Sequence, residues 1–443
     1  MLDVGLLNQY FVHNYQLINQ YNIRGTDMNR EVLKDILLSQ EKREFLQGKI
    51  IKRELEKKVL HFDANSFIII ISGIRRCGKS TLLHQIRKPD SYYVNFDDER
   101  FLNFKVNDFQ KMYEILIELF GKKDKFYFDE IQNIEGWERF VRRLHNQGKR
   151  IFITGSNASM LSQEMGTHLT GRNIRIELYP FSFREFLRYQ DKEVENNSNL
   201  VSTQKAELKR LFLSYMKLGG FPEFLNTGKI EYLQNLYENI LFRDIIARYN
   251  IRSQKALQAT ALFAASNIGK QISFNQLKKM TGLTSGTTIK NFFQYLENSY
   301  LTFLLPRFNY SLKSQIYSNK KVYLIDPKLS QVIGFRFSED RGRILENMVF
   351  LHLKRNFEEL FFHKEKYECD FIVKKDLNIK KAIQVTWQLT DHNKKRELNG
   401  LLEALNKYNL NQGLLLTFDQ ENIIKIDNKK IILMPVWKWM LEA

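Results

Sequence analysis

The stretch that decides the fold is FIIIISGIRRCGKSTLL, which runs from Phe67 to Leu83. An apolar run leads into the pattern G-x-x-x-x-G-K-S, from Gly73 to Ser80, and a helix-compatible segment follows. Glycines let such a loop turn its backbone N–H groups toward phosphate oxygens, which bulkier residues would obstruct. Because strand, loop and helix stand in the required order, the stretch predicts a phosphate-binding loop and not a chance glycine turn.

We expect this loop to bind ATP together with Mg²⁺. Lys79 would place a cation at the β and γ phosphates, the Ser80 hydroxyl would bind the metal, and the N-terminus of the following helix would add its partial positive charge. Arg75 and Arg76, inside the loop, either touch the nucleotide or remain solvated. The predicted nucleotide-binding residues are Gly73, Gly78, Lys79, Ser80 and Thr81.

The segment KFYFDEIQNI places an acidic pair, Asp129 and Glu130, at the carboxyl end of another apolar strand. An aspartate there can hold Mg²⁺, and a glutamate can orient or deprotonate the attacking water. An acidic pair at a strand end is often a helix cap, but its position one strand along from the loop favours catalysis. We therefore predict Ser80 and Asp129 as metal ligands, and Lys79 and Glu130 as catalytic residues.

Two further positions are candidates for catalysis. IFITGSNASML ends a strand in Ser156 and Asn157, which could position the water or sense the γ-phosphate, although a turn with a helix N-cap explains the same residues equally well. LTGRNIRIEL places Arg172 directly before another apolar strand. We predict that Arg172 acts as a catalytic arginine, in its own or a neighbouring subunit's site, with a surface salt bridge as the alternative.

The composition indicates several domains and a polyanionic partner. A chain of 443 residues exceeds what one hydrophobic core normally fills. Its 68 Lys and Arg against 50 Asp and Glu give a net charge of +18. Residues 251–330, called the basic module below, hold eleven Lys or Arg against two acids, which is half of that excess. This segment is therefore the leading candidate for DNA binding.

The cysteine content points to a reducing compartment. The two cysteines, Cys77 and Cys369, lie far apart, which argues against a disulfide framework or a cysteine-based zinc site. The N-terminus lacks the pattern of a secretory signal. The longest aliphatic run, Phe67–Ile71, is far shorter than the roughly 20 apolar residues that span a bilayer. We expect a soluble, cytoplasmic protein without a membrane partner.

The chain resembles a known family. The succession GIRRCGKSTLL, FDEIQNIEGWERFVRRL, ITGSNASML, LTGRNIRIELYPFSFREF and LGGFPEF is similar to that of prokaryotic AAA+ ATPases that carry a nuclease-like C-terminal domain of unknown function. The resemblance covers nearly all of the chain beyond about residue 60. It implies the roles given above for Lys79, Ser80, Asp129, Glu130 and Asn157.

The expected fold class is α/β, because short apolar runs alternate with amphipathic segments in the manner of a parallel sheet covered on both faces. The strands expected in this sheet are Phe67–Ser72, Tyr92–Phe96, Phe126–Asp129, Ile151–Thr154 and Ile174–Leu178. Further strands are expected near Phe361, Phe371 and Ile383 and over Gly413–Phe418. The resemblance adds a helical lid, a winged helix and a restriction-endonuclease-like domain. The predicted boundaries are 1–60 for a helical N-terminal extension, 61–180 for the AAA+ core, 181–250 for the lid, 251–330 for the winged helix and 331–443 for the nuclease-like domain.

The basic module is expected to form a helix over Ser273–Met280, a turn, a second helix over Thr284–Leu296 and a strand. Short polar and basic side chains on such a second helix reach phosphates and base edges in a DNA groove. Winged helices also serve as protein-contact modules, and the aromatic residues Phe292, Phe293 and Tyr295 are equally consistent with a core. The DNA-binding candidates are Lys278, Lys279, Thr284, Ser285, Thr287, Thr288 and Lys290.

The nuclease-like domain departs from its relatives at the expected metal site. Such nucleases use an Asp on one strand and Glu-x-Lys on the next, because two carboxylates bind Mg²⁺ and the lysine stabilises the attacking hydroxide. Here Glu346 and Asp370 are present, but Gln384 and Thr386 replace the Glu and the Lys. Since an amide is a poor Mg²⁺ ligand, we expect a catalytically dead nuclease fold used for binding, with a repurposed active site as the alternative.

Three functions of different classes stay open. The favoured one is a DNA-associated ATPase, whose turnover DNA would stimulate. The second is a nucleotide-switched regulator of protein partners, which DNA would not stimulate. The third is an ATP-dependent nuclease, which requires DNA cutting that depends on Asp370. A homo-oligomer is compatible with all three.

Overall fold

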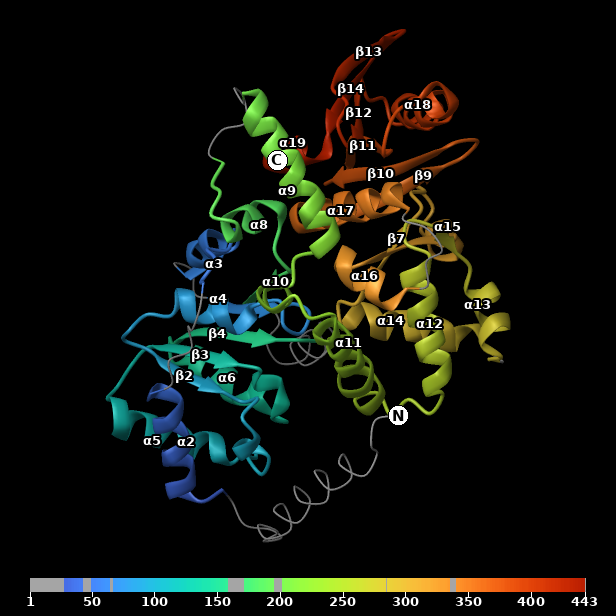
Figure 1. Ribbon diagram of the computed structural model, residues 1–443. Coiled ribbons are helices and arrows are strands. Elements are labelled where there is room, and N and C mark those ends of the chain that lie inside the picture. Colours follow the sequence, from blue (N-terminus) through green and yellow to red (C-terminus); the bar gives the residue numbers. More distant parts are fainter. Residues whose placement is uncertain are drawn as a thin grey trace.

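The computed structural model describes residues 28–42, 49–63, 67–157, 171–194, 201–283, 285–334 and 340–442. An N-terminal lobe built on one sheet lies at one end, and the C-terminal sheet lies at the other, with helices of the middle of the chain between them (Figure 1). Within the described residues, none of the helices combines the length and apolar character that crossing a bilayer requires.

The N-terminal lobe contains an all-parallel sheet of order β2-β3-β4-β1-β5. The five strands that the sequence predicts are confirmed to within a residue or two. They are β1 (Ile68–Ser72), β2 (Tyr92–Asn95), β3 (Lys125–Asp129), β4 (Arg150–Gly155) and β5 (Asn173–Glu177).

Helices cover both faces of this sheet. Ile69 and Ile71 of β1 pack into one hydrophobic core with α4 (Lys79–Ile86), whereas Ile68 and Ile70 face a second core. The second core is completed by α2 (Arg30–Lys42), α5 (Asp108–Phe120) and α6 (Trp137–Asn146). Alternation along β1 therefore sends successive isoleucines to opposite faces. The described part of the predicted N-terminal extension, α2 and α3 (Glu56–Asp63), packs on this lobe.

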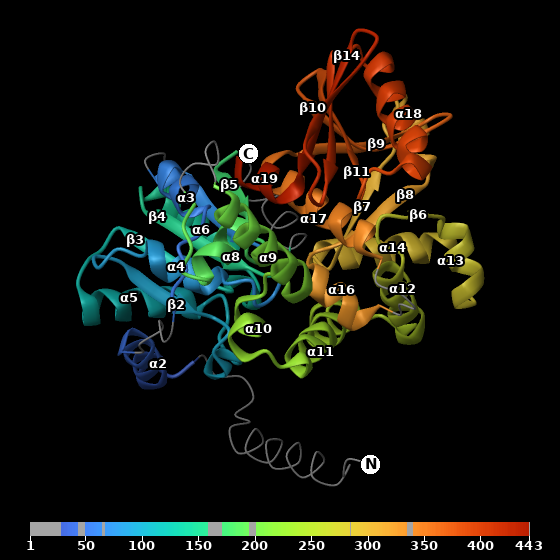
Figure 2. The same cartoon turned by 45° about the horizontal axis from the view of Figure 1, so that its top comes forward.

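The segment predicted as a lid is helical. Its elements are α8 (Phe183–Tyr189), α9 (Ser202–Leu218), α10 (Pro222–Thr227), α11 (Ile230–Asn239) and the π-helix η3 (Ile240–Ala247). Ser182 and Glu185 form a capping box that starts α8. Helices α8 and α9 contact α19 (Val436–Glu442), so this segment links the N-terminal lobe to the end of the chain (Figure 2).

The basic module combines helices with a three-stranded antiparallel sheet of order β6-β8-β7. The two predicted helices are confirmed as α13 (Phe274–Thr281) and α14 (Gly286–Asn298), and Phe292 and Phe293 are core residues. The remaining elements are α12 (Gln254–Ser266), β6 (Gln271–Ile272), β7 (Thr302–Pro306), α15 (Leu312–Tyr317), β8 (Lys320–Leu324) and α16 (Pro327–Ile333).

The C-terminal domain has a mixed six-stranded sheet of order β13-β14-β12-β11-β10-β9. The sequence predicted four strands of this sheet, β9 to β12, but it did not predict β13, β14 or the helix α19. The elements are α17 (Arg341–Asn356), β9 (Glu359–Lys364), β10 (Glu368–Lys375), β11 (Asn378–Val385), α18 (Asp391–Lys407), β12 (Gln412–Thr417), β13 (Asn422–Ile426), β14 (Lys429–Pro435) and α19.

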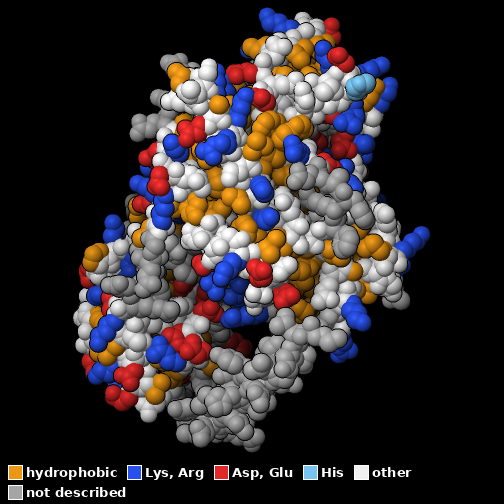
Figure 3. All heavy atoms as spheres, in the orientation of Figure 1, with side chains coloured by type: hydrophobic (Ala, Val, Ile, Leu, Met, Phe, Trp, Pro, Cys, Tyr) orange, Lys and Arg blue, Asp and Glu red, His pale blue; other side chains and the backbone are white. Residues whose placement is uncertain are grey.

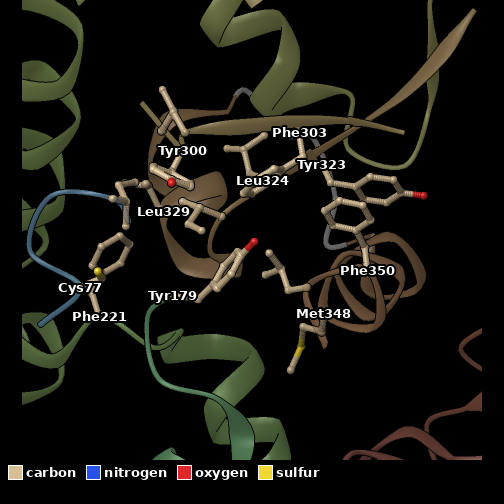
Figure 4. Close-up of a cluster of buried hydrophobic side chains, with 14 of the residues drawn as sticks. Cys77, Tyr179, Phe221, Tyr300, Phe303, Tyr323, Leu324, Leu329, Met348 and Phe350 are labelled. Carbon is tan, nitrogen blue, oxygen red and sulfur yellow. The ribbon is translucent and has the colours of Figure 1, made fainter. Parts of the chain in front are cut away.

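A continuous hydrophobic core joins these parts. In Figure 4, Tyr179 of the N-terminal lobe lies between Leu329 of the basic module and Met348 of α17, and Cys77 lies beside Phe221 in the same cluster. The basic module also joins the C-terminal sheet directly, since the Phe308 N–H donates to the Phe362 carbonyl at 2.8 Å. The position of the modules is therefore held by apolar packing as well as by backbone contact.

Candidate nucleotide-binding site

The predicted phosphate-binding loop connects β1 to α4, at the carboxyl edge of the parallel sheet. Gly78 has φ 99°, in the left-handed region that side chains disfavour. A Cβ at Gly73 would overlap the Leu178 carbonyl oxygen. Both glycines of the motif are therefore required by the backbone itself, one for its conformation and one for its close packing.

A cavity of about 800 Å³ opens beside this loop. Its volume falls in the range of sites that hold small-molecule ligands. On the face shown in Figure 3 the surface is hollowed between the N-terminal lobe and the lid helices, and acidic and basic side chains gather around the hollow. Of the predicted site residues, those that line the cavity are Gly78, Lys79, Ser80, Thr81, Asp129 and Glu130.

The acidic pair lies next to the loop lysine. Lys79 Nζ is 3.3 Å from Glu130 Oε1 and donates to the Ile74 carbonyl at 3.2 Å. Glu130 has φ 51°, a left-handed turn that ends β3 and directs its side chain back to the loop. Asp129 accepts hydrogen bonds from the Ser80 hydroxyl, from Thr154 and from Tyr93. The two predicted metal ligands are therefore in contact.

The charges of this group are set by burial and by mutual contact. Burial, reinforced by the neighbouring Glu130, raises the pKa of Asp129. Burial also opposes ionisation of Glu130, but Lys79, Gln132 and Arg75 together more than offset it and lower the pKa of Glu130. At Lys79 burial lowers the pKa, but Glu130, Cys77 and Asp129 together outweigh it and raise the pKa of Lys79. Lys79 and Glu130 are therefore an ion pair at neutral pH.

The other two predicted catalytic residues, Asn157 and Arg172, lie at opposite ends of the strands. Asn157 is fully buried directly after β4, and the Ser156 N–H before it donates to Glu130 Oε2 at 3.3 Å. Arg172 precedes β5, at the amino end of the sheet, and its Nη1 donates to Asn146 Oδ1 at 2.6 Å. The five-residue strand separates Arg172 from the loop edge by roughly 17 Å. Arg172 is thus not brought to the cavity of its own chain, and a role across subunits stays a prediction.

Sequence reasoning missed Arg53, which lines the cavity. Its buried guanidinium donates to the Cys77 carbonyl at 2.8 Å, the Tyr179 carbonyl at 2.6 Å and Glu185 Oε1 at 2.9 Å. It therefore ties the phosphate loop to the start of α8. No local motif surrounds Arg53, so the sequence offered no signal for it.

Arg75, which the sequence left either in contact with the nucleotide or solvated, lines the cavity, as does Arg76, and Arg75 is also held in an ion pair. Its Nε and Nη2 contact the two carboxylate oxygens of Asp244 in the π-helix η3, at 3.0 and 2.9 Å. Asp244 is buried. The phosphate loop is thus connected to the lid by a bidentate ion pair.

The DNA-binding candidates lie on α13 and around the start of α14. Lys279, Ser285, Thr287 and Lys290 are exposed, whereas Lys278 and Thr288 are partly buried. Thr284 lies outside the described residues. Ser285 uses its hydroxyl to cap α14, accepting from the Thr287 N–H at 3.2 Å.

The predicted nuclease-like residues surround a second cavity of about 720 Å³. Glu346, Asp370 and Gln384 all line it, as does Thr386. The Gln384 amide accepts from the Asp370 N–H at 3.2 Å and donates to Glu397 Oε2 at 2.7 Å. Gln384 is thus held by its neighbours on β10 and α18. The sequence analysis did not predict Glu397, whose carboxylate accepts this hydrogen bond from the neutral amide of Gln384.

Comparison with known proteins agrees with this description. The family model described as an AAA domain matches residues 65–187, and a domain of unknown function matches residues 209–336. The region that the AAA model matches contains β1 to β5 and the loop, so the N-terminal lobe is an AAA domain with a phosphate-binding loop of the kind that binds nucleotides.

Two proteins of similar sequence show the family to which the chain belongs. It is 36% identical over 418 residues to the uncharacterized protein MJ1544 of Methanocaldococcus jannaschii, covering 89% of this chain and 92% of that protein. An uncharacterized protein of Haemophilus influenzae is 31% identical over 401 residues, covering 86% of this chain and 96% of that protein. The chain belongs to the same family as these two proteins.

Solved structures resemble the chain only distantly. A signal-transduction ATPase with numerous domains from Pyrococcus horikoshii is 14% identical with a TM-score of 0.26, over 70% of this chain and 46% of that one. AMPPCP-bound DnaA from Aquifex aeolicus is 15% identical with a TM-score of 0.22, over 57% of this chain and 93% of that one. At these scores the likenesses add nothing to the family match.

Proposed function

We propose that this protein binds ATP with Mg²⁺ and hydrolyses it, and that it works in association with DNA. The observation that carries the proposal is the meeting of Lys79, Ser80, Asp129 and Glu130 in one cavity beside the phosphate loop. Lys79 and Ser80 begin α4, and the acidic pair lies at the end of β3, so two segments far apart in the sequence meet at this point. A cation, a hydroxyl and two carboxylates in this arrangement match the chemistry of phosphoryl transfer.

The residues present fit both ligands. The loop glycines leave room for phosphate oxygens, Lys79 would bind them, and Ser80 and Asp129 would hold the metal. Bound Mg²⁺ supplies positive charge that neutralises the phosphates. Glu130 would orient the attacking water and accept its proton. Because Lys79 pairs with Glu130 in this structure, a phosphate group would compete for Lys79 and leave Glu130 available as the base.

DNA association is supported by the basic module. Lys279, Thr287 and Lys290 are exposed on and beside α14, the helix that follows the turn in a helix-turn-helix arrangement. We propose that residues 251–330 act as a winged helix, and that the C-terminal domain is a nuclease-like fold without nuclease activity. The buried Cys77 and Cys369 are both free thiols, so the proposal includes a cytoplasmic location.

The test is steady-state ATP hydrolysis by the purified protein, with and without single-stranded, double-stranded and branched DNA. We expect turnover that one of these DNAs stimulates, with a stimulation that declines as salt rises. Glu130→Gln is the control and should hydrolyse ATP at least about a hundredfold more slowly. Unchanged turnover in Glu130→Gln would remove the role assigned to this residue.

A nucleotide-switched regulator of protein partners is the second candidate. Its support is the direct connection of the phosphate loop to the lid through Arg75 and Asp244 and to α8 through Arg53. This function predicts slow hydrolysis that DNA leaves unchanged. It also predicts that Lys79→Ala alters the binding of protein partners.

Two further parts of the proposal have separate tests. An ATP-dependent nuclease would require Mg²⁺-dependent DNA cutting that Asp370→Ala abolishes, and the absence of cutting by the wild type excludes it. A homo-oligomer in which Arg172 acts on a neighbouring subunit requires that Arg172→Ala and Glu130→Gln chains complement one another when mixed. No recovery of turnover in that mixture would leave Arg172 as a structural residue.

A further inference from the structure

The second cavity lies where the basic module meets the C-terminal domain. It is lined by residues of β8, α17, β10, β11 and α18, which belong to both parts of the chain. Figures 1 and 2 both show α17 and β7 beside the strands β9 and β10. The cavity is thus formed by two modules that are separate in the sequence.

One lysine of the basic module enters this cavity. Lys321, on β8, is 1% exposed, and its ammonium contacts three carboxylates. Its Nζ is 2.8 Å from Asp370 Oδ1, 2.9 Å from Glu368 Oε1 and 3.0 Å from Glu346 Oε1. An ammonium has three N–H donors, and these three acceptors use all of them.

The three carboxylates converge on the nitrogen from two elements. Glu346 comes from α17, while Glu368 and Asp370 lie two residues apart on β10 and so share a face of that strand. Tyr323 adds a hydrogen bond to Glu346 Oε1 at 2.7 Å, and the Val385 N–H donates to Asp370 Oδ2 at 2.9 Å. These supports fix the carboxylates in place around one central position.

Such a position has the chemistry of a site for a hard divalent cation. Carboxylate oxygens are the ligands that Mg²⁺, Mn²⁺ and Ca²⁺ prefer, at roughly 2.0–2.6 Å, whereas an ammonium sits at hydrogen-bond distance. The observed distances are those of hydrogen bonds, and the oxygens would have to close in by about half an ångström to hold a metal ion. Lys321 occupies the point on which they would close.

We propose that Lys321 is an internal cation that closes the carboxylate site of the C-terminal domain to divalent metal ions while the basic module is docked. The site is then blocked by a residue of a neighbouring module, in addition to having Gln384 in place of a carboxylate. Removal of the ammonium leaves Glu346, Glu368 and Asp370 facing one another, and a divalent cation becomes the species that balances their charge.

Other contacts keep the two modules together when Lys321 is replaced. The Phe308 N–H donates to the Phe362 carbonyl at 2.8 Å, which joins the end of β7 to β9. Gln271 Nε2 donates to Glu368 Oε2 at 2.7 Å. Tyr323 stacks on Phe350 of α17 with ring centroids 4.2 Å apart. These contacts do not involve Lys321, so we expect its replacement by methionine, a side chain of similar length, to preserve the docked arrangement.

The test is a titration with Mn²⁺ in the absence of nucleotide, followed by the electron paramagnetic resonance signal of free Mn²⁺. All proteins carry Asp129→Asn, so that the phosphate-loop site takes up no metal. We expect Lys321→Met to bind one Mn²⁺ per chain at least about a hundredfold more tightly than the parent, because a cation about 3 Å away is removed. Addition of Asp370→Asn should abolish that binding.

The matched control is Lys366→Met, which removes a lysine that lines the same cavity without being one of the carboxylate contacts described above. It should leave Mn²⁺ binding as in the parent. The proposal is overturned if Lys321→Met keeps a native circular dichroism spectrum and gains no Mn²⁺ binding. It is also overturned if the parent with Lys321 binds Mn²⁺ tightly in a manner that Asp370→Asn removes. That second measurement can overturn the proposal even if Lys321→Met does not fold.

Discussion

Arg75 in the phosphate loop and Asp244 in the π-helix of the lid form a bidentate ion pair, although they lie 169 residues apart in the sequence. Asp244 is buried, and the Arg75 side chain is 20% exposed. A nearby pair, Arg243 and Asp97, spans the same junction at 2.8 Å but is far more exposed. Two ion pairs at one junction thus differ mainly in their exposure to water.

Arg75→Met should destabilise the protein by about 3 kcal/mol, because it leaves the buried Asp244 carboxylate without its partner. The double variant Arg75→Met/Asp244→Leu should recover most of the loss. Thermal unfolding midpoints check both. Arg243→Met is the control and should cost at most about 1 kcal/mol, since exposed pairs contribute little. Equal losses in Arg75→Met and Arg243→Met would contradict the assignment.

Lys79→Met should weaken ATP binding by roughly ten- to hundredfold, because it removes the charged donor to the phosphates. Glu130→Gln should bind ATP at least as tightly as the wild type, since its neutral amide no longer holds Lys79 in an ion pair. Equilibrium binding of a fluorescent ATP analogue measures both. Lys88→Met, an exposed lysine just after α4, is the control. Weaker binding in Glu130→Gln would show that the carboxylate supports the ligand.

Gly400→Ala should lower the unfolding free energy by about 1–3 kcal/mol, although alanine normally favours a helix. Gly400 lies inside α18, and a Cβ there would overlap the Glu368 carbonyl oxygen. Gly286→Ala, at the start of α14, meets its nearest neighbour only at 3.8 Å and should leave stability unchanged or slightly higher. Thermal midpoints compare the two, and a neutral Gly400→Ala would mean that α18 shifts at no cost.

Glu297→Gln should change how stability depends on pH. Burial raises the pKa of Glu297 from 4.5 to about 7, partly offset by the hydrogen bond from the Leu304 N–H at 2.8 Å. The folded state therefore holds this proton while the unfolded state has released it, so wild-type stability falls as pH rises from about 4.5 to about 7.

A glutamine cannot ionise, and its carbonyl oxygen can still accept from Leu304. The unfolding free energy of Glu297→Gln should match that of the wild type below this pH window and exceed it above the window by up to about 2 kcal/mol. Because Glu297 is only partly buried, this figure is smaller than the full pKa shift would give. Unfolding midpoints across the pH range measure this difference. Parallel curves for the two proteins would refute the role of Glu297.

Some parts of the structure follow from local sequence patterns. The five strands of the N-terminal sheet are short apolar runs, and their spacing with amphipathic helices indicates parallel order. Because the carboxyl ends of parallel strands meet at one edge, Asp129 and Glu130 could be placed beside Lys79 from sequence. The expected spacing of one strand was wrong, since β4 lies between β1 and β3 and the acidic pair is two strands from the loop. The strands β13 and β14 were missed, although the alternation in Asn422–Ile426 is a usable signal.

The sequence by itself determined the phosphate loop and the acidic pair, because each depends on a few neighbouring residues whose backbone conformation and side-chain type act together. Only the tertiary structure decided that Arg53 and Arg75 connect the loop to the lid, and that Lys321 lies among the carboxylates of another module. Such pairings join residues far apart in the chain. No local periodicity encodes them, since they arise only when packing brings the two elements together and desolvates the charges.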